Sequence, residues 1–144
     1  MLVACSSAAT VASLANAGVC YVYVRNATAP YTYALAATLQ SPTPRAGGFF
    51  GGQDGSVSVS ATGLVVAIGE PAVAPSGTAY GSGTVYVFTA ADASWASSTS
   101  VQLAPTTPLA GNFYGWMVSV FVCAARCPHT TTPYTPHNQT TPTT

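Results

Sequence analysis

Gly83-Thr-Val-Tyr-Val-Phe88 matches an earlier stretch of the same chain, Gly18-Val-Cys-Tyr-Val-Tyr23, and this internal match is the strongest indication of the fold. Both stretches combine β-branched and aromatic residues, which pack well on a pleated sheet. Further blocks match in the same order, at an offset between 63 residues (1 to 64) and 65 residues (18 to 83). Ordered self-similarity at a nearly constant offset is the signature of a repeat architecture.

The other matched blocks divide the chain into units. They are Met1 to Cys5 over Leu64 to Ile68, Tyr31 over Trp95, Leu39 over Leu103, Gln40 to Pro44 over Ala104 to Pro108, and Ala46 to Gly51 over Ala110 to Gly115. We therefore expect an incomplete unit at 1–49, a complete unit at 50–112, the start of a third unit at 113–127 and a disordered Thr/Pro-rich tail at 128–144.

Each unit is predicted to form short antiparallel strands. Ser56 to Ser60 alternates as a half-buried strand does, Leu64 to Ile68 is apolar throughout, and Ser100 to Leu103 is a weaker fourth strand. No segment shows convincing helical periodicity. The sequence thus predicts an all-β fold of tandem four-stranded antiparallel β-propeller blades in an incomplete propeller. A β-sandwich of two unrelated sheets is the alternative, which the repeat disfavours.

The motifs of the complete unit resemble a known repeat. Phe50-Gly51, then Gly69-Glu70-Pro71 after the apolar strand, then Gly83 to Phe88 are similar to the FG-GAP repeat of integrin-alpha-type β-propellers. The start of another copy follows, with Phe113 and Gly115. The resemblance spans residues 1–120 and implies an extracellular propeller whose loops contact protein or glycan.

Two departures from the FG-GAP pattern stand out. The first unit has Ser6-Ser7-Ala8 in place of Gly-Ala-Pro, and the third has Tyr114 between its Phe and its Gly. Glu70 aligns with the Ala of the family's Gly-Ala-Pro motif. We therefore expect it to be a loop residue and not a general acid.

No metal site or cofactor is expected. Some members of the family carry an acid-rich calcium loop after the first strand, but that loop is here Ser60-Ala-Thr-Gly63, and Asp54 nearby is a lone acid. Cys123, Cys127 and His129 are spaced like zinc ligands, yet no second ligand pair completes four-coordination. Incidental cysteines or a local disulfide are the simpler interpretations there.

Composition argues against several classes of function. Three Arg, three acids and no Lys among 144 residues leave no basic patch for nucleic acid or anionic lipid. No apolar run is long enough to span a membrane. The two histidines, His129 and His137, lie in the tail, where nothing orients them toward a nucleophile, so an enzyme is not expected.

The cysteines and sequons bear on where the protein resides. Cys5 and Cys20 align with Ile68 and Val85, which are expected at buried strand positions. The two cysteines are therefore either buried free thiols, the favoured interpretation, or a disulfide pair. Asn26 and Asn138 begin Asn-X-Thr sequons in predicted loops, which favours an extracellular or cell-surface protein. Met1 to Ala17 is not a convincing signal peptide, since it lacks a positive start.

Three functions remain to be weighed. The first is a non-catalytic adhesion module that binds protein or glycan, with Tyr31, Tyr80 and Trp95 as candidate contacts, although Trp95 is equally suited to packing. The second is a glycosylated structural spacer. The third, an enzyme or its attached propeller, has the least support. Because a closed propeller needs about four to eight blades, we expect a fragment of a larger protein or association with other chains.

Overall fold

The computed structural model describes residues 1–28, 30–52, 56–73 and 81–121, which contain seven strands and no helix. The strands are β1 (Leu2–Ser6), β2 (Val19–Arg25), β3 (Tyr33–Leu39), β4 (Val57–Val59), β5 (Val65–Glu70), β6 (Thr84–Ala90) and β7 (Ser98–Leu103). The all-β expectation is confirmed, and the weak fourth strand of the complete unit is β7. Over the part of the chain described, there is no helix long and apolar enough to cross a membrane. The predicted tail at 128–144 lies outside the described residues.

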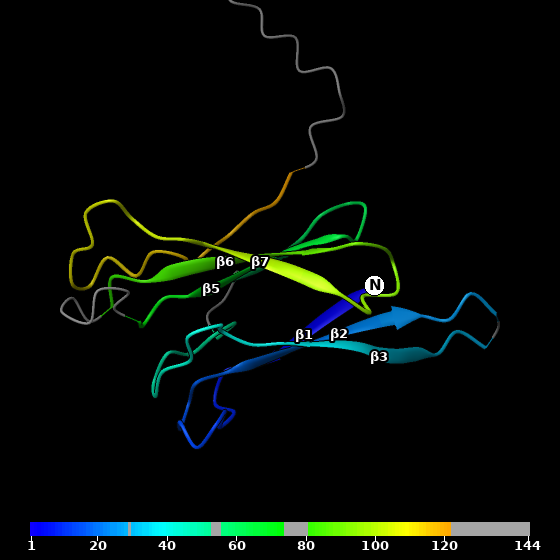
Figure 1. Ribbon diagram of the computed structural model, residues 1–144, viewed down its shortest axis with the longest axis horizontal. Coiled ribbons are helices and arrows are strands. Elements are labelled where there is room, and N and C mark those ends of the chain that lie inside the picture. The colour runs from blue at the N-terminus through cyan, green and yellow to red at the C-terminus, as the bar shows by residue number, and fades with distance from the viewer. Residues whose placement is uncertain (29, 53–55, 74–80, 122–144) are drawn as a thin grey trace, which may run out of the picture.

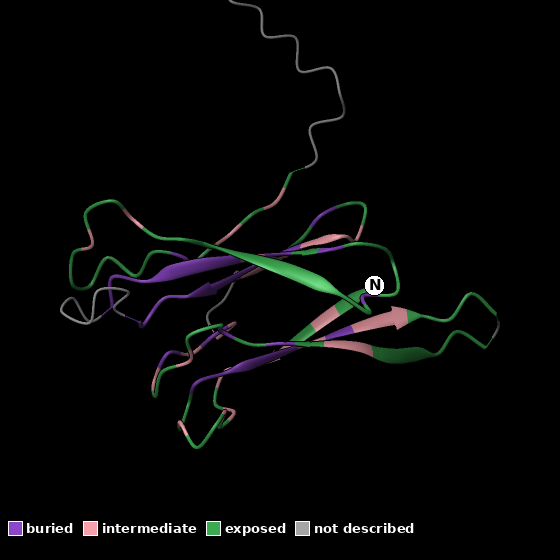
Figure 2. Ribbon diagram, in the orientation of Figure 1, coloured by how far each residue is buried: buried purple, intermediate pink, exposed green. Residues whose placement is uncertain are grey.

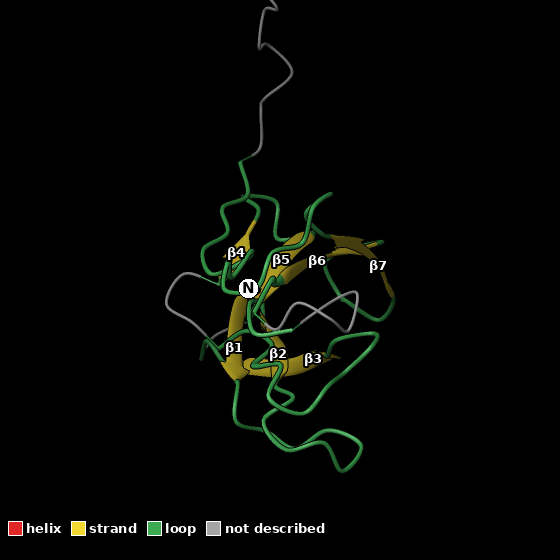
Figure 3. Cartoon of the chain, turned by 90° about the vertical axis from the view of Figure 1, so that its left-hand side faces the viewer, coloured by secondary structure: helices red, strands yellow, loops and turns green. Residues whose placement is uncertain are grey.

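The strands form two antiparallel sheets, one of three strands and one of four. The first sheet has the order β1-β2-β3, and the second has the order β4-β5-β6-β7. Within each sheet, strands adjacent in sequence are adjacent in space, as hairpin-like connections require. The two sheets lie face to face, one above the other in Figure 1, and the end-on view in Figure 3 shows the two layers separately.

The hydrophobic core lies between the two sheets. Side chains alternate along each strand, so only every second residue faces the core. The buried cluster consists of Cys20, Val22, Leu39, Phe50, Val66, Ile68, Tyr86, Phe88, Ala90 and Trp95. In Figure 2, β5 and β6 are largely buried, whereas β7 is exposed along its length.

Strand register corrects one detail of the repeat alignment. Cys5 pairs with Cys20 in the first sheet, and Gly69 pairs with Val85 in the second. Since Cys20 and Val85 are counterparts, Cys5 corresponds to Gly69 and not to Ile68 as the sequence match predicted. A slip of one residue moves every side chain of a strand to the opposite face, so this difference decides which residues meet between the sheets.

The corrected register also changes the first motif. The counterpart of Gly69-Glu70-Pro71 is Cys5-Ser6-Ser7, not Ser6-Ser7-Ala8. Glu70 is the last residue of β5 and is fully buried, so the prediction that it lies in a loop was wrong. The strand continues to Glu70 because its backbone still pairs with Thr84 of β6.

Candidate functional site

Phe50 and Gly51 join the first unit to the second. The Phe50 ring is fully buried between the sheets, with its centroid 6.1 Å from those of Tyr86 and Phe88. The backbone N–H of Phe50 donates to the carbonyl of Ala17, with an N···O distance of 3.1 Å. The Phe-Gly motif therefore anchors the second sheet on the loop that precedes β2. We call this contact of Phe50-Gly51 with the first unit the joint.

Gly51 lies directly on the Cys5 and Cys20 sulfur atoms. A Cβ atom at position 51 would lie 2.5 Å from Sγ of Cys20 and 2.8 Å from Sγ of Cys5. The residue also has a φ of +69°, which L side chains rarely adopt. Its N–H donates to the carbonyl of Gly69 at 2.9 Å, so Gly51 is held between the two sheets. Only glycine satisfies both the backbone conformation and the close approach.

The same joint recurs between the second unit and the start of the third. The N–H of Tyr114 donates to the carbonyl of Ser82 at 2.9 Å, as that of Phe50 does to Ala17. Gly115 has a φ of +85° and packs on Gly69 and Val85, the counterparts of Cys5 and Cys20. The joint is thus repeated at the same positions of both units.

This geometry assigns the residues of the third motif. Phe113 has a φ of 46° and is the counterpart of Phe49, whose φ is 53°. Tyr114 therefore occupies the place of Phe50, and Gly115 that of Gly51. Tyr114 is no insertion into a Phe-Gly motif, because the motif of the third unit is Tyr114-Gly115.

Glu70 is a buried carboxyl group at the first joint. Its Oε2 accepts a hydrogen bond from the hydroxyl of Ser41 at 2.9 Å, while Oε1 has no hydrogen-bond partner among the described residues. Burial raises the pKa of Glu70 from 4.5 to about 7, although the Ser41 hydrogen bond and the charge of Arg45 oppose the shift. This burial could not be predicted from the sequence, since Glu70 follows the apolar run Leu64 to Ile68 and precedes Pro71, where a turn is expected.

The Cys5–Cys20 pair is a disulfide in the structure. The two residues face each other across β1 and β2, with a sequence separation of 15 residues. Of the two alternatives left open by the sequence, the structure therefore has the cross-link and not the buried thiols. Disulfides persist mainly in oxidising compartments such as the extracellular space.

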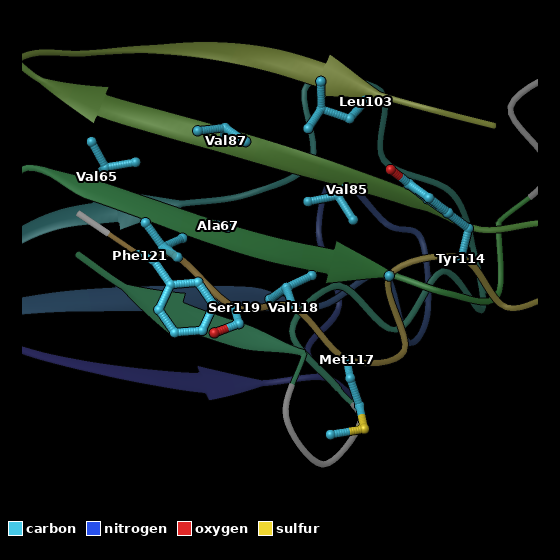
Figure 4. A pocket seen from close by; sticks show the side chains of 12 residues that line it. Val65, Ala67, Val85, Val87, Leu103, Tyr114, Met117, Val118, Ser119 and Phe121 are labelled. Carbon is cyan, nitrogen blue, oxygen red and sulfur yellow. The ribbon is translucent and has the colours of Figure 1, made fainter. Parts of the chain in front are cut away.

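The outer face of the second sheet carries an apolar groove of about 540 Å³. Val65, Ala67, Val85 and Val87 form its floor, and the chain from Tyr114 to Phe121 runs along it. In Figure 4, Phe121 and Val118 lie beside Ala67, while Leu103 lies at the far edge. This surface has the apolar character of a contact surface, and it lies on the side of the sheet away from the core.

A second surface lies at the tip between β2 and β3. The guanidinium carbon of Arg25 lies 4.6 Å from the centroid of the Tyr31 ring, which is exposed. Beside this pair, Oδ1 of Asn26 accepts hydrogen bonds from the N–H and the hydroxyl of Thr28. The sequon at Asn26 is therefore exposed in a tight turn, as a glycosylation acceptor must be.

The structure places the remaining candidates as follows. Trp95 is buried and donates its indole N–H to the carbonyl of Gly63 at 2.9 Å, so it closes the packing and offers no ligand contact. The described residues contain no cluster of three or more His, Cys, Asp and Glu side chains. Tyr80, Asp54, Cys123, Cys127, His129, His137 and Asn138 lie outside the described residues.

Comparison with known proteins adds no family. No protein-family model matches this chain, and no curated protein matches its sequence.

Proposed function

We propose that this protein is a non-catalytic repeat module of the FG-GAP β-propeller type, which acts outside the cytosol by binding a protein or a glycan. The observation that carries the proposal is the repeated joint. The N–H groups of Phe50 and Tyr114 donate to equivalent carbonyls, and Gly51 and Gly115 pack at equivalent positions of successive units. In a propeller, blades stack around an axis through a contact that each pair of neighbours repeats. A sandwich of two unrelated sheets would not be expected to repeat this contact at equivalent positions of each sheet.

The Cys5–Cys20 disulfide supports a location in an oxidising compartment. The exposed sequon at Asn26 agrees with a secretory route. Further blades, from the same gene product or from other chains, would complete a ring of about four to eight.

The tip formed by Arg25 and Tyr31 is the proposed ligand contact. Tyr and Arg are the residue types that most often dominate binding energy, because they offer large contact area together with polar groups. Arg25 stacked on Tyr31 holds the ring in one orientation before a ligand arrives, which lowers the entropic cost of binding.

A binding assay tests this function. The secreted chain is applied to a glycan array and to a panel of purified extracellular-matrix proteins, beside the variants Tyr31→Ala and Thr99→Ala. We expect saturable binding to one ligand, weakened about tenfold or more by Tyr31→Ala and unchanged by Thr99→Ala, which lies on β7. The absence of saturable binding on both panels would contradict the proposal.

A structural spacer is the second candidate. It is favoured by the exposed Asn26 turn, because a glycan attached there would stand beside Tyr31 and cover the tip. Mass spectrometry of the secreted protein separates the two functions. Full occupancy of Asn26 together with no ligand binding would support the spacer.

A further inference from the structure

Each outer face of the two-sheet structure is the repeat counterpart of a face that packs between the sheets. The face of the first sheet that packs against the second carries Val3, Cys5, Cys20 and Val22. In the corrected register, their counterparts are Ala67, Gly69, Val85 and Val87, which lie on the outer face of the second sheet. This outer face is the floor of the apolar groove.

The outer face of the second sheet is exposed at its edge, whereas Ala67 and Val85 on its floor are only 4% and 6% exposed. Leu39 and Phe50 at the internal joint are 3% and 0% exposed, whereas their counterparts Leu103 and Tyr114 are 43% and 40% exposed. The residues are of the same kind, and the difference is the presence of a sheet above them.

The outer face of the first sheet has the opposite character. Leu2, Ala4, Tyr21 and Tyr23 lie there, and Leu35 joins them opposite Tyr23. Their counterparts in the second sheet, Val66, Ile68, Tyr86 and Phe88, are the side chains that cover the first sheet inside the chain. Leu2 and Leu35 are 51% and 56% exposed, and the charged side chain of Arg25 lies at the end of β2 on the same face.

We propose that a second copy of this chain docks head to tail, with the outer face of its first sheet on the outer face of the second sheet of its neighbour. The inference rests on the proposed repeat function and names its partner. Each pair of faces then repeats the contact that the two sheets already make within one chain. Because the two faces differ, the contact is heterologous, and it closes into a ring when the rotation per copy allows.

An unpaired strand edge agrees with this arrangement. β1 is an edge strand in the described first sheet, whereas its counterpart β5 pairs with β4 on that side. Phe121 is the last described residue along the groove. It lies 64 positions after Val57, the first residue of β4, and is its repeat counterpart. Head-to-tail docking therefore brings Phe121 of one copy toward the free edge of β1 in the next.

Light scattering coupled to size exclusion tests the proposal on the full chain. We expect the wild-type mass to rise with protein concentration above that of one chain. Two variants each disable one face at exposed positions: Val101→Lys with Leu103→Lys on the second sheet, and Leu2→Lys with Leu35→Lys on the first. Each variant alone should run as a single chain. Ser100→Lys, on the other face of β7, is the matched control and should associate as the wild type does.

Mixing the two face variants distinguishes head-to-tail contact from other association. Each variant retains one intact face, so an equimolar mixture should form a complex of two chains and no larger species. A wild-type protein that stays a single chain at all concentrations would overturn the proposal, and so would a mixture that does not combine. If wild type is a single chain yet binds a ligand, the repeat function stands and only the self-association fails.

Discussion

At the scale of single residues, Gly51 shows how a small side chain holds two units together. Two separate costs follow its replacement by alanine. One is the unfavourable φ of +69°, worth about 1–2 kcal/mol, and the other is the overlap of a new Cβ with the cystine sulfur atoms. Gly47 has a φ of +71° but no atom within 4 Å of its Cβ position, so its replacement carries only the first cost.

We therefore predict that Gly51→Ala lowers the free energy of unfolding by about 1 kcal/mol or more beyond the loss caused by Gly47→Ala. Urea unfolding followed by tryptophan fluorescence measures both values. Equal losses for the two variants would mean that the contact of Gly51 with the disulfide contributes nothing to the joint.

Glu70 makes stability depend on pH. Below its unfolded pKa of 4.5, the carboxyl group is protonated in both states. Between pH 4.5 and about 7, the unfolded chain loses the proton while the folded chain keeps it, so the free energy of unfolding falls as the pH rises. Above that window the loss is complete, at about 3 kcal/mol.

Glu70→Gln should therefore abolish the decline between these pH values and make the protein more stable than wild type at pH 8. Thermal unfolding at a series of pH values measures this. Asp92→Asn is the control, because hydrogen bonds from Ser94 hold the pKa of Asp92 below its usual range and thus outside the window. A wild type whose stability is flat across the window would contradict the burial of an ionisable Glu70.

At the scale of elements, the Cys5–Cys20 disulfide ties β1 to β2. The second sheet has no disulfide at the equivalent position, where Gly69 pairs with Val85. Cys5→Ala with Cys20→Val removes the cross-link while keeping apolar side chains at both positions. Closing a loop of about 15 residues contributes about 3 kcal/mol, so we predict a loss of that size.

Chemical denaturation of the double variant measures the loss. A reducing agent should destabilise the wild type by a similar amount and leave the variant unchanged. If the reductant has no effect on the wild type, then β1 is held by its backbone pairing and side-chain packing alone.

At the scale of the whole molecule, the low charge of the chain bears on the proposed head-to-tail association. Only six of 144 side chains are Lys, Arg, Asp or Glu, and the two faces proposed to dock are almost entirely apolar. We predict that the head-to-tail association constant changes by no more than about twofold between about 0.05 M and 0.5 M NaCl, because screening acts on charges. Ammonium sulfate should strengthen it.

Sedimentation velocity at several salt concentrations measures the constant. A steep decrease with NaCl would show that charges such as Arg25 carry the contact in place of the apolar faces. Val101→Lys with Leu103→Lys, which disables one face, should show no association at any salt concentration.

The strands and their order along the chain could be predicted from the amino-acid sequence alone. β-branched and aromatic runs, separated by Gly and Pro, locate β5, β6 and β7, and their repetition locates β1, β2 and β3. The aligned blocks Ala46 to Gly51 and Ala110 to Gly115 also marked the expected start of each new unit, but the sequence motif paired Phe113 with Gly115, and only the structure assigned Tyr114 to the place of Phe50. The strands and the aligned blocks depend on neighbours along the chain, where composition and periodicity act directly.

Which faces of the strands meet could be learned from the three-dimensional fold and not from the sequence. The stretches around Cys5 and Ile68 are apolar in either register, so their residues match equally well when shifted by one position. Pairing of β1 with β2 and of β5 with β6 resolves the shift, because backbone hydrogen bonds join residues far apart in sequence. The same non-local contacts bring Cys5 to Cys20, bury Glu70 beside Ser41 and leave Leu103 without the cover that Leu39 has.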